Sequence, residues 1–168
     1  MLTVGVFANA WLYRVLGENG RNDLAYRLLT DESVEGSSML RMVYRLKNGT
    51  LNESFTGIRD SLNHMFLGGG PQAWIYRCLM GMSAVEPGFK KYRLQPYFPD
   101  KLVNLDVSFD SPNGTIGLSW RRVSDVITLT VTVPHNSLGK VVLDEEENLL
   151  KPGENVFVQK NGNWKRGK

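Results

Sequence analysis

The sequence lacks the features that would place it in several common classes of protein. Its single cysteine, Cys78, cannot form a disulfide within the chain, so nothing in it requires an oxidising compartment. It has no run of about eighteen apolar residues, which excludes a membrane-spanning helix. Twenty Lys and Arg against seventeen Asp and Glu leave a net charge of +3, without a long block of one sign. That balance is too mild to indicate a nucleic-acid partner.

Motifs for several kinds of chemistry are also missing. Gly68-Gly69-Gly70 is followed by no Gly-Lys-Ser or Gly-Lys-Thr, so we expect it to turn the backbone before Pro71 and not to bind phosphate. Cys78 and His135 have no metal-ligand spacing, and we predict neither a metal site nor a cofactor. No serine or cysteine stands in a recognisable nucleophile elbow.

The start of the chain lacks the basic residues and apolar core of a signal peptide. A helical pattern begins almost at the first residue, as in a chain cut from a longer one, and that is what we expect here. The compartment therefore stays open between the cytoplasm, the periplasm and the exterior, depending on the missing N-terminus.

The first half of the chain has the three-to-four-residue periodicity of helices, whereas the second half alternates with a period of two. The predicted helices are residues 2–16, a second capped by Asn22-Asp23, a third from Ser37 or Ser38 to Asn48, and a fourth from Pro71 to about Met82. Proline suits the first turn of that fourth helix because its missing N–H is not needed there.

Beyond Gly88, short alternating runs are separated by turn residues such as Pro112-Asn113-Gly114. The predicted strands are residues 91–94, 102–109, 115–121, 126–133, 140–143 and 154–159. Such spacing indicates a small antiparallel sandwich. The fold class is therefore α+β with segregated domains, residues 1–88 being helical and residues 89–168 a β-sandwich, with the boundary near Pro87-Gly88.

A polar segment between the third and fourth predicted helices holds the residues best suited to chemistry. Glu53 could act as a general base on water, although most loop glutamates are surface residues. His64 could orient a water or contact a sugar hydroxyl, or it could be a structural histidine bonded to backbone. Asn63 suits a sugar-binding site but also closes turns. Trp11 and Trp74 could stack on sugars, although at helical spacing an aromatic is more often core.

The order of the motifs resembles the C-terminal part of bacterial α-L-rhamnosidases, glycoside hydrolase family 78, over nearly all 168 residues. In the helical half the resemblance is carried by Asn19 to Leu29, Gly49-Thr50-Leu51-Asn52-Glu53, Ser61-Leu62-Asn63-His64, Trp74-Ile75-Tyr76-Arg77, Gly81 and Glu86 to Lys91. In the second half it is carried by Phe109 to Gly114, Ser119-Trp120, Val133-Pro134-His135-Asn136 and Lys151-Pro152-Gly153.

The resemblance implies that residues 1–88 are the last helices of an (α/α)6 barrel of the six-hairpin glycosidase type, followed by the terminal β-sandwich. It implies an inverting hydrolase that acts on rhamnosylated glycans or glycosides. Glu53 would be the general base and His64 would lie in the same pocket. The neighbouring Asn63 is the candidate substrate contact because of its amide. The family's general acid lies upstream, so this chain alone should be inactive. The family usually has tryptophan where this chain has Asn52.

A second hypothesis is a non-catalytic module, in which the sandwich binds polysaccharide and the helices serve as its docking base. Few aromatics are available for an exposed sugar platform, because Trp120 alternates with polar neighbours and is expected in the core. Trp164 near the end of the chain is the one candidate for an exposed aromatic, with a disordered tail as the alternative. Helices cut from their barrel neighbours would also leave apolar surface open, which predicts self-association of the isolated chain.

Overall fold

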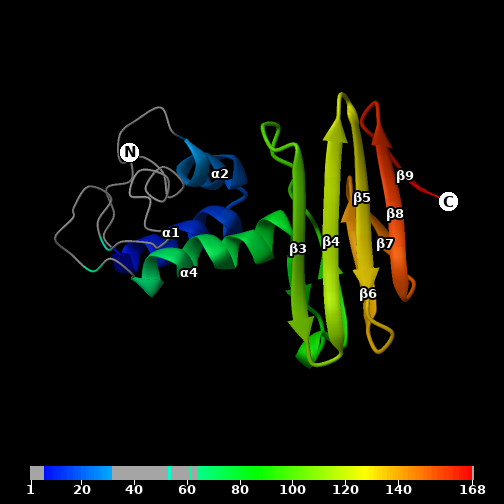
Figure 1. The fold of residues 1–168 in the computed structure, drawn as a ribbon, viewed down its shortest axis with the longest axis horizontal. Coiled ribbons are helices and arrows are strands. Elements are labelled where there is room, and N and C mark those ends of the chain that lie inside the picture. Colours follow the sequence, from blue (N-terminus) through cyan, green and yellow to red (C-terminus); the bar gives the residue numbers. More distant parts are fainter. Residues whose placement is uncertain (1–5, 32–52, 54–60, 62–63, 168) are drawn as a thin grey trace. The chain divides into compact units, whose positions relative to one another are not determined.

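The computed structural model describes residues 6–31, 53, 61 and 64–167 (Figure 1). The chain divides into two compact units, Met1–Ile75 and Tyr76–Lys168, and each is described by itself. The division falls earlier than the boundary that the sequence predicts near Pro87-Gly88, and the assignment of residues 1–88 and 89–168 as domains stays a prediction. The predicted third helix lies outside the described residues. No described helix has the length and apolar character needed to cross a membrane.

Three helices are described in the first unit. They are α1 (Val6–Glu18), α2 (Asn22–Thr30) and α4 (Met65–Trp74). Helix α1 packs along α4, and Tyr13 of α1 lies fully buried with its ring centroid 6.3 Å from that of Trp74. The Trp74 indole Nε1 donates a hydrogen bond of 2.9 Å to Asn22 Oδ1, so this tryptophan is a core residue. Trp11 instead is 61% exposed.

The triple glycine does not form the turn that the sequence predicts, because all three residues lie inside α4, and Pro71 follows them within the helix. Pro71 therefore does not begin a helix. The space around Gly70 explains why a glycine stands there. A Cβ at this position would lie 2.7 Å from the Asn9 carbonyl oxygen and 2.8 Å from the Ala10 Cα. The missing side chain lets the backbones of α1 and α4 approach closely.

Replacing Gly70 by alanine should therefore destabilise the helical unit, although alanine is the better helix former. Overpacking against a backbone typically costs about 1–3 kcal/mol. The matched control is Gly69→Ala, because nothing lies within 4 Å of a Cβ at that position. Gly69→Ala should gain up to about 1 kcal/mol from helix propensity. Urea unfolding of the 168-residue chain, followed by circular dichroism, compares the two; equal stability would contradict the packing argument.

A π-helical turn, Ile75–Leu79, spans the division between the units, and the chain then enters a strand, β1 (Met82–Ala84). The helix predicted to reach Met82 therefore ends earlier, and the first strand precedes Gly88. Gly81 separates the two elements with a φ of +69°, a conformation that L side chains rarely adopt. A short 3-10 turn, Pro87–Phe89, then leads into β2 (Lys91–Leu94).

Nine strands form two sheets in the described residues, one of four strands in the order β1-β2-β6-β7 and one of five in the order β3-β4-β5-β8-β9. The remaining strands are β3 (Asn104–Ser111), β4 (Gly114–Val123), β5 (Val126–Val133), β6 (Leu138–Leu143), β7 (Glu146–Leu149), β8 (Gly153–Lys160) and β9 (Asn163–Arg166). Strands β2 and β6 pair in parallel, so the smaller sheet is mixed and not purely antiparallel as predicted. This parallel pairing is possible because β3 to β5, which lie in the other sheet, supply the long connection that two parallel strands need.

The inner faces of the two sheets share one apolar core, to which Leu94 and Val141 contribute from one sheet and Trp120 and Phe157 from the other. Trp120 is 2% exposed, which confirms the sequence prediction. Trp164 packs against this core with its ring centroid 5.2 Å from that of Phe98, so the prediction of an exposed tryptophan was wrong. The segment that carries Phe98 is close because the Arg122 guanidinium donates hydrogen bonds to its backbone carbonyls.

Candidate functional site

Glu53 is described as an exposed residue that is bonded to a residue eight positions later. Its backbone N–H donates to the Ser61 carbonyl oxygen at 2.9 Å, and the Ser61 N–H donates to Glu53 Oε2 at 3.3 Å. These two hydrogen bonds hold the backbone and the carboxylate of Glu53 beside Ser61. Since a carboxylate can accept several hydrogen bonds, the group keeps the capacity to accept a proton from water.

His64 is the N-cap residue of α4, with extended backbone angles of φ −106° and ψ 103°. Its side chain is half-buried, and the Nδ1 atom is shielded from solvent. Ser61 lies only three positions earlier, so its Cα lies within about 11 Å of that of His64 along the chain. The bond between Glu53 and Ser61 therefore ties the carboxylate to the stretch that leads to the imidazole.

Other sequence-predicted features of this segment are not described. Asn63, the expected substrate contact, and Asn52 lie outside the described residues. The catalytic role of Glu53 and the pocket role of His64 stay predictions. Among the residues that the structure describes, no group of three or more His, Cys, Asp or Glu side chains is placed to hold a metal ion.

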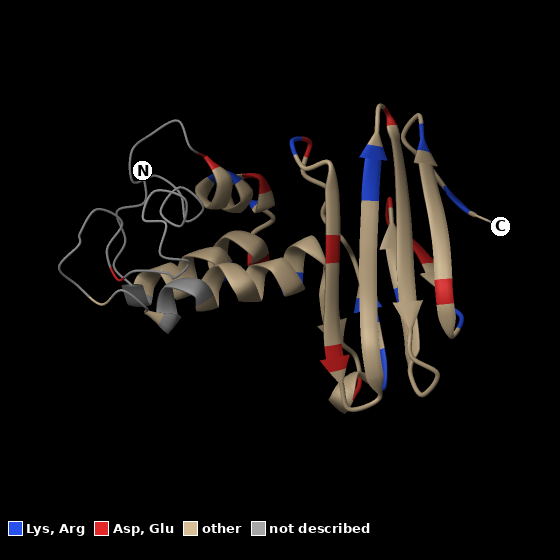
Figure 2. Cartoon of the chain, in the orientation of Figure 1, with Lys and Arg blue, Asp and Glu red and all other residues tan. Residues whose placement is uncertain are grey.

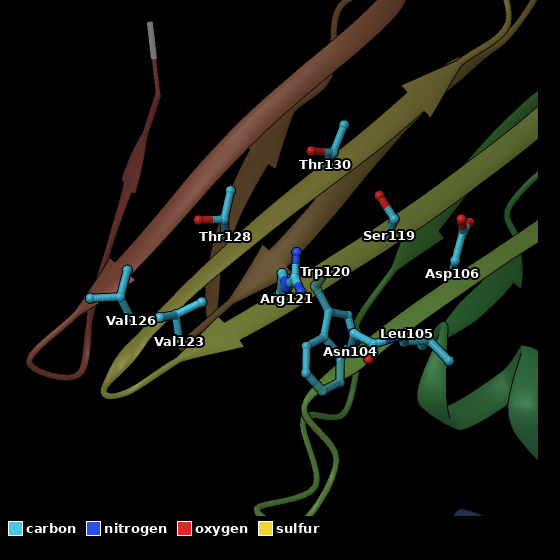
Figure 3. A pocket seen from close by; sticks show the side chains of 10 residues that line it. All are labelled: Asn104, Leu105, Asp106, Ser119, Trp120, Arg121, Val123, Val126, Thr128 and Thr130. Carbon is cyan, nitrogen blue, oxygen red and sulfur yellow. The ribbon is translucent and has the colours of Figure 1, made fainter.

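A groove of about 580 Å³ lies in the second unit, on the outer face of β3, β4 and β5 (Figure 3). Its polar lining includes Asp106, Ser119, Arg121, Thr128 and Thr130. Figure 3 shows Asp106, Ser119, Thr128 and Thr130 projecting to one side of the sheet, whereas Trp120 projects to the other. No motif in the sequence indicates this groove. The available signal was the polar half of each alternating strand, which by itself indicates only a solvated face.

Comparison with known proteins gives a family match in the second unit. Residues 81–157 match the family described as bacterial alpha-L-rhamnosidase C-terminal domain. The matched region begins at Gly81, the turn into β1, and ends at Phe157 within β8, so it covers most of both sheets.

Individual relatives extend the similarity into the helices. The chain is 34% identical over 148 residues to an alpha-L-rhamnosidase of an Alteromonas species, covering 80% of this chain. It is 28% identical over 155 residues to an alpha-L-rhamnosidase of Formosa agariphila, covering 86% of this chain. The chain spans only 15% and 16% of the lengths of these two relatives.

A solved structure shares the fold. The Streptomyces avermitilis alpha-L-rhamnosidase, determined in complex with L-rhamnose, aligns with a TM-score of 0.76 at 20% identity. The alignment covers 95% of this chain and 18% of that one. The order of helices followed by two sheets is therefore the order found in that protein.

Proposed function

We propose a function from the premise that this chain carries the C-terminal domain of a bacterial α-L-rhamnosidase. The chain would be part of an inverting glycoside hydrolase that removes terminal α-L-rhamnose. The observation that supports this most is the extent of the similarity. It covers 86% of the chain in one relative, so it reaches well beyond the family match at residues 81–157. The helices would then be the last helices of an (α/α)6 barrel, most of which lies outside this chain.

In this proposal Glu53 is the general base that activates water. An inverting glycosidase holds two carboxyl groups about 6.5–9.5 Å apart, one to protonate the leaving oxygen and one to accept a proton from the attacking water. The exposed Glu53 carboxylate, anchored by Ser61, fits the second task. His64 and Asn63, which follow Glu53 in the chain, would contact the sugar or the water. The general acid would come from the preceding part of the longer protein.

The division of the catalytic pair makes the proposal testable with a chromogenic α-L-rhamnoside. The longer protein that contains this chain should hydrolyse it, and the 168-residue chain should not, because it would supply the base without the acid. Turnover by the isolated chain would contradict the division of the pair. Failure of the longer protein on α-L-rhamnosides, with activity on another glycoside, would overturn the substrate.

The surface of α1 supports a related proposal about association. Trp11 and Val15 lie one helical turn apart and are 61% and 51% exposed. In the longer protein this apolar pair would be covered by preceding barrel helices, so the isolated chain should self-associate through it. Light scattering should show the chain as a dimer or larger species, and Trp11→Glu should shift it towards monomer. A wild-type chain that stays monomeric at high concentration would contradict this expectation.

A further inference from the structure

The proposed hydrolysis assigns no role to the residues that line the groove on β3, β4 and β5. Its catalytic candidates, Glu53 and His64, are not among the lining residues. The groove is an open depression of about 580 Å³ on the face of the sheet, so a ligand would lie against the strands and stay partly exposed to solvent. The side chains that line it decide which class of ligand it would recognise.

Strand register arranges the lining in rows across the sheet. Asp106 faces Ser119, which faces Thr130, and in the next row Asn104 faces Arg121, which faces Thr128. Successive residues on one face of a strand lie about 6.8 Å apart, so three rows span about 14 Å, the length of one or two pyranose rings. The groove therefore presents its polar groups as a grid and not at a single point.

Two of these groups carry opposite charges that are left available. Arg121 and Asp106 come from neighbouring rows of adjacent strands, and both side chains are exposed. Within the described residues, neither has an ion-pair or hydrogen-bond partner for its side chain. Figure 2 shows acidic residues on β3 and basic residues at the end of the neighbouring β4, so both signs of charge lie on this sheet. A groove with one cation and one anion favours a neutral ligand over an anion.

The remaining polar groups are hydroxyls and an amide. Ser119, Thr128 and Thr130 each offer a hydroxyl that both donates and accepts. A ligand that satisfies such a lining, together with a guanidinium donor and a carboxylate acceptor, must itself carry several groups that donate and accept. A polyhydroxylated ring, that is, a sugar, meets this requirement.

One end of the groove is apolar. Val123 and Val126 face each other beside the turn between β4 and β5, and Val123 is 64% exposed. Figure 3 shows the two valines at the opposite end of the groove from Asp106 and Thr130. A sugar with a methyl group at one end and hydroxyls along its ring would match both parts of the lining, because the methyl would be buried against the valines.

We infer that this groove binds a 6-deoxyhexose, with the ring hydroxyls on Asp106, Arg121 and the strand hydroxyls and the C6 methyl against Val123 and Val126. The site retains sugar without cleaving it and goes beyond the proposed hydrolysis. Only the choice of L-rhamnose among 6-deoxyhexoses rests on the proposed function. No aromatic platform is needed, because the ring is held by hydrogen bonds from the sheet face.

The test is a titration of the ¹⁵N-labelled 168-residue chain with L-rhamnose, followed by amide chemical shifts. Shifts should gather on β3, β4 and β5 and saturate. L-mannose, which differs from L-rhamnose by a hydroxyl on C6, should bind about three- to tenfold more weakly because that hydroxyl would face the valines. Arg121→Gln and Asp106→Asn should each weaken L-rhamnose binding about tenfold or more, since each removes a charged hydrogen-bonding partner.

Lys165→Gln is the matched control. Lys165 faces Val158, which faces Thr128, so it lies in the same row and on the same sheet face as Arg121 but outside the groove. It should leave the affinity unchanged within about twofold. The inference is overturned if L-rhamnose causes no saturable shifts on these strands, or if Arg121→Gln and Lys165→Gln have equal effects. Shifts only near Ser61 and His64 would overturn it while supporting the proposed function. If L-rhamnose binds in the groove but the longer protein does not hydrolyse α-L-rhamnosides, the groove inference is supported and the proposed function is overturned.

Discussion

Glu53→Gln in the longer protein is expected to lower kcat for α-L-rhamnoside hydrolysis by about a thousandfold, within the range of about 10²–10⁴ for a positioned acid or base. Glutamine has the same size and keeps an oxygen for the Ser61 N–H, so the local hydrogen bond should persist. Glutamine cannot accept the proton of the attacking water, so kcat should fall. Because its size and its contact with Ser61 are kept, KM should change little. Steady-state kinetics on a chromogenic rhamnoside measure both constants.

The matched control for that variant is Glu154→Gln, a change of the same charge at an exposed position on β8. Its kcat should equal that of the unmodified protein. A Glu53→Gln protein that keeps more than about a tenth of the activity would show that another group acts as the base. The substrate could still be a rhamnoside in that case, because the substrate is tested separately by the activity of the longer protein.

Gly81→Ala should cause the largest loss of stability among the substitutions considered. A Cβ at this position would lie 1.9 Å from the Gln95 carbonyl oxygen and 2.6 Å from its backbone nitrogen. The backbone cannot step aside, because the Gln95 N–H also donates a 2.9 Å hydrogen bond to the Gly81 carbonyl oxygen. The left-handed φ of +69° adds strain for any L side chain. Together these should lower the free energy of unfolding by about 4 kcal/mol or more.

Gly153→Ala separates the two causes of that loss. Gly153 also has a positive φ, +86°, but nothing lies within 4 Å of a Cβ there. It should cost only the conformational strain, about 1–2 kcal/mol. Urea unfolding followed by tryptophan fluorescence reports on the sheet unit through the buried Trp120. Similar losses for the two variants would show that the contact with Gln95 is relieved by a small shift.

Local patterns in the sequence were sufficient to predict which face of each alternating strand is buried. The run Ile116, Leu118 and Trp120 was predicted to face one side of a strand, and all three are buried on the inner face of β4. The family resemblance was confirmed by the match at residues 81–157. These inferences hold because side chains two residues apart on a strand share a face whatever the strand pairs with.

The groove on β3, β4 and β5 and the contact between α1 and α4 could not be predicted from local sequence patterns. Asp106, Ser119 and Thr130 are separated along the chain and share a row only through the register of three strands. Gly70 resembled part of a turn because the sequence does not show that the α1 backbone passes against it. The roles of Glu53 and His64 also rest on resemblance and stay predictions.

The sequence by itself determined the helical and alternating halves, the buried face of each central strand and the family of the second unit. Only the tertiary structure decided that Trp164 packs against the sandwich core, that β2 and β6 run in parallel, and that a polar groove crosses three strands. The physical reason is range. Periodicity records which side chains share a face of one element, whereas packing, strand order and grooves depend on contacts between residues far apart in the chain.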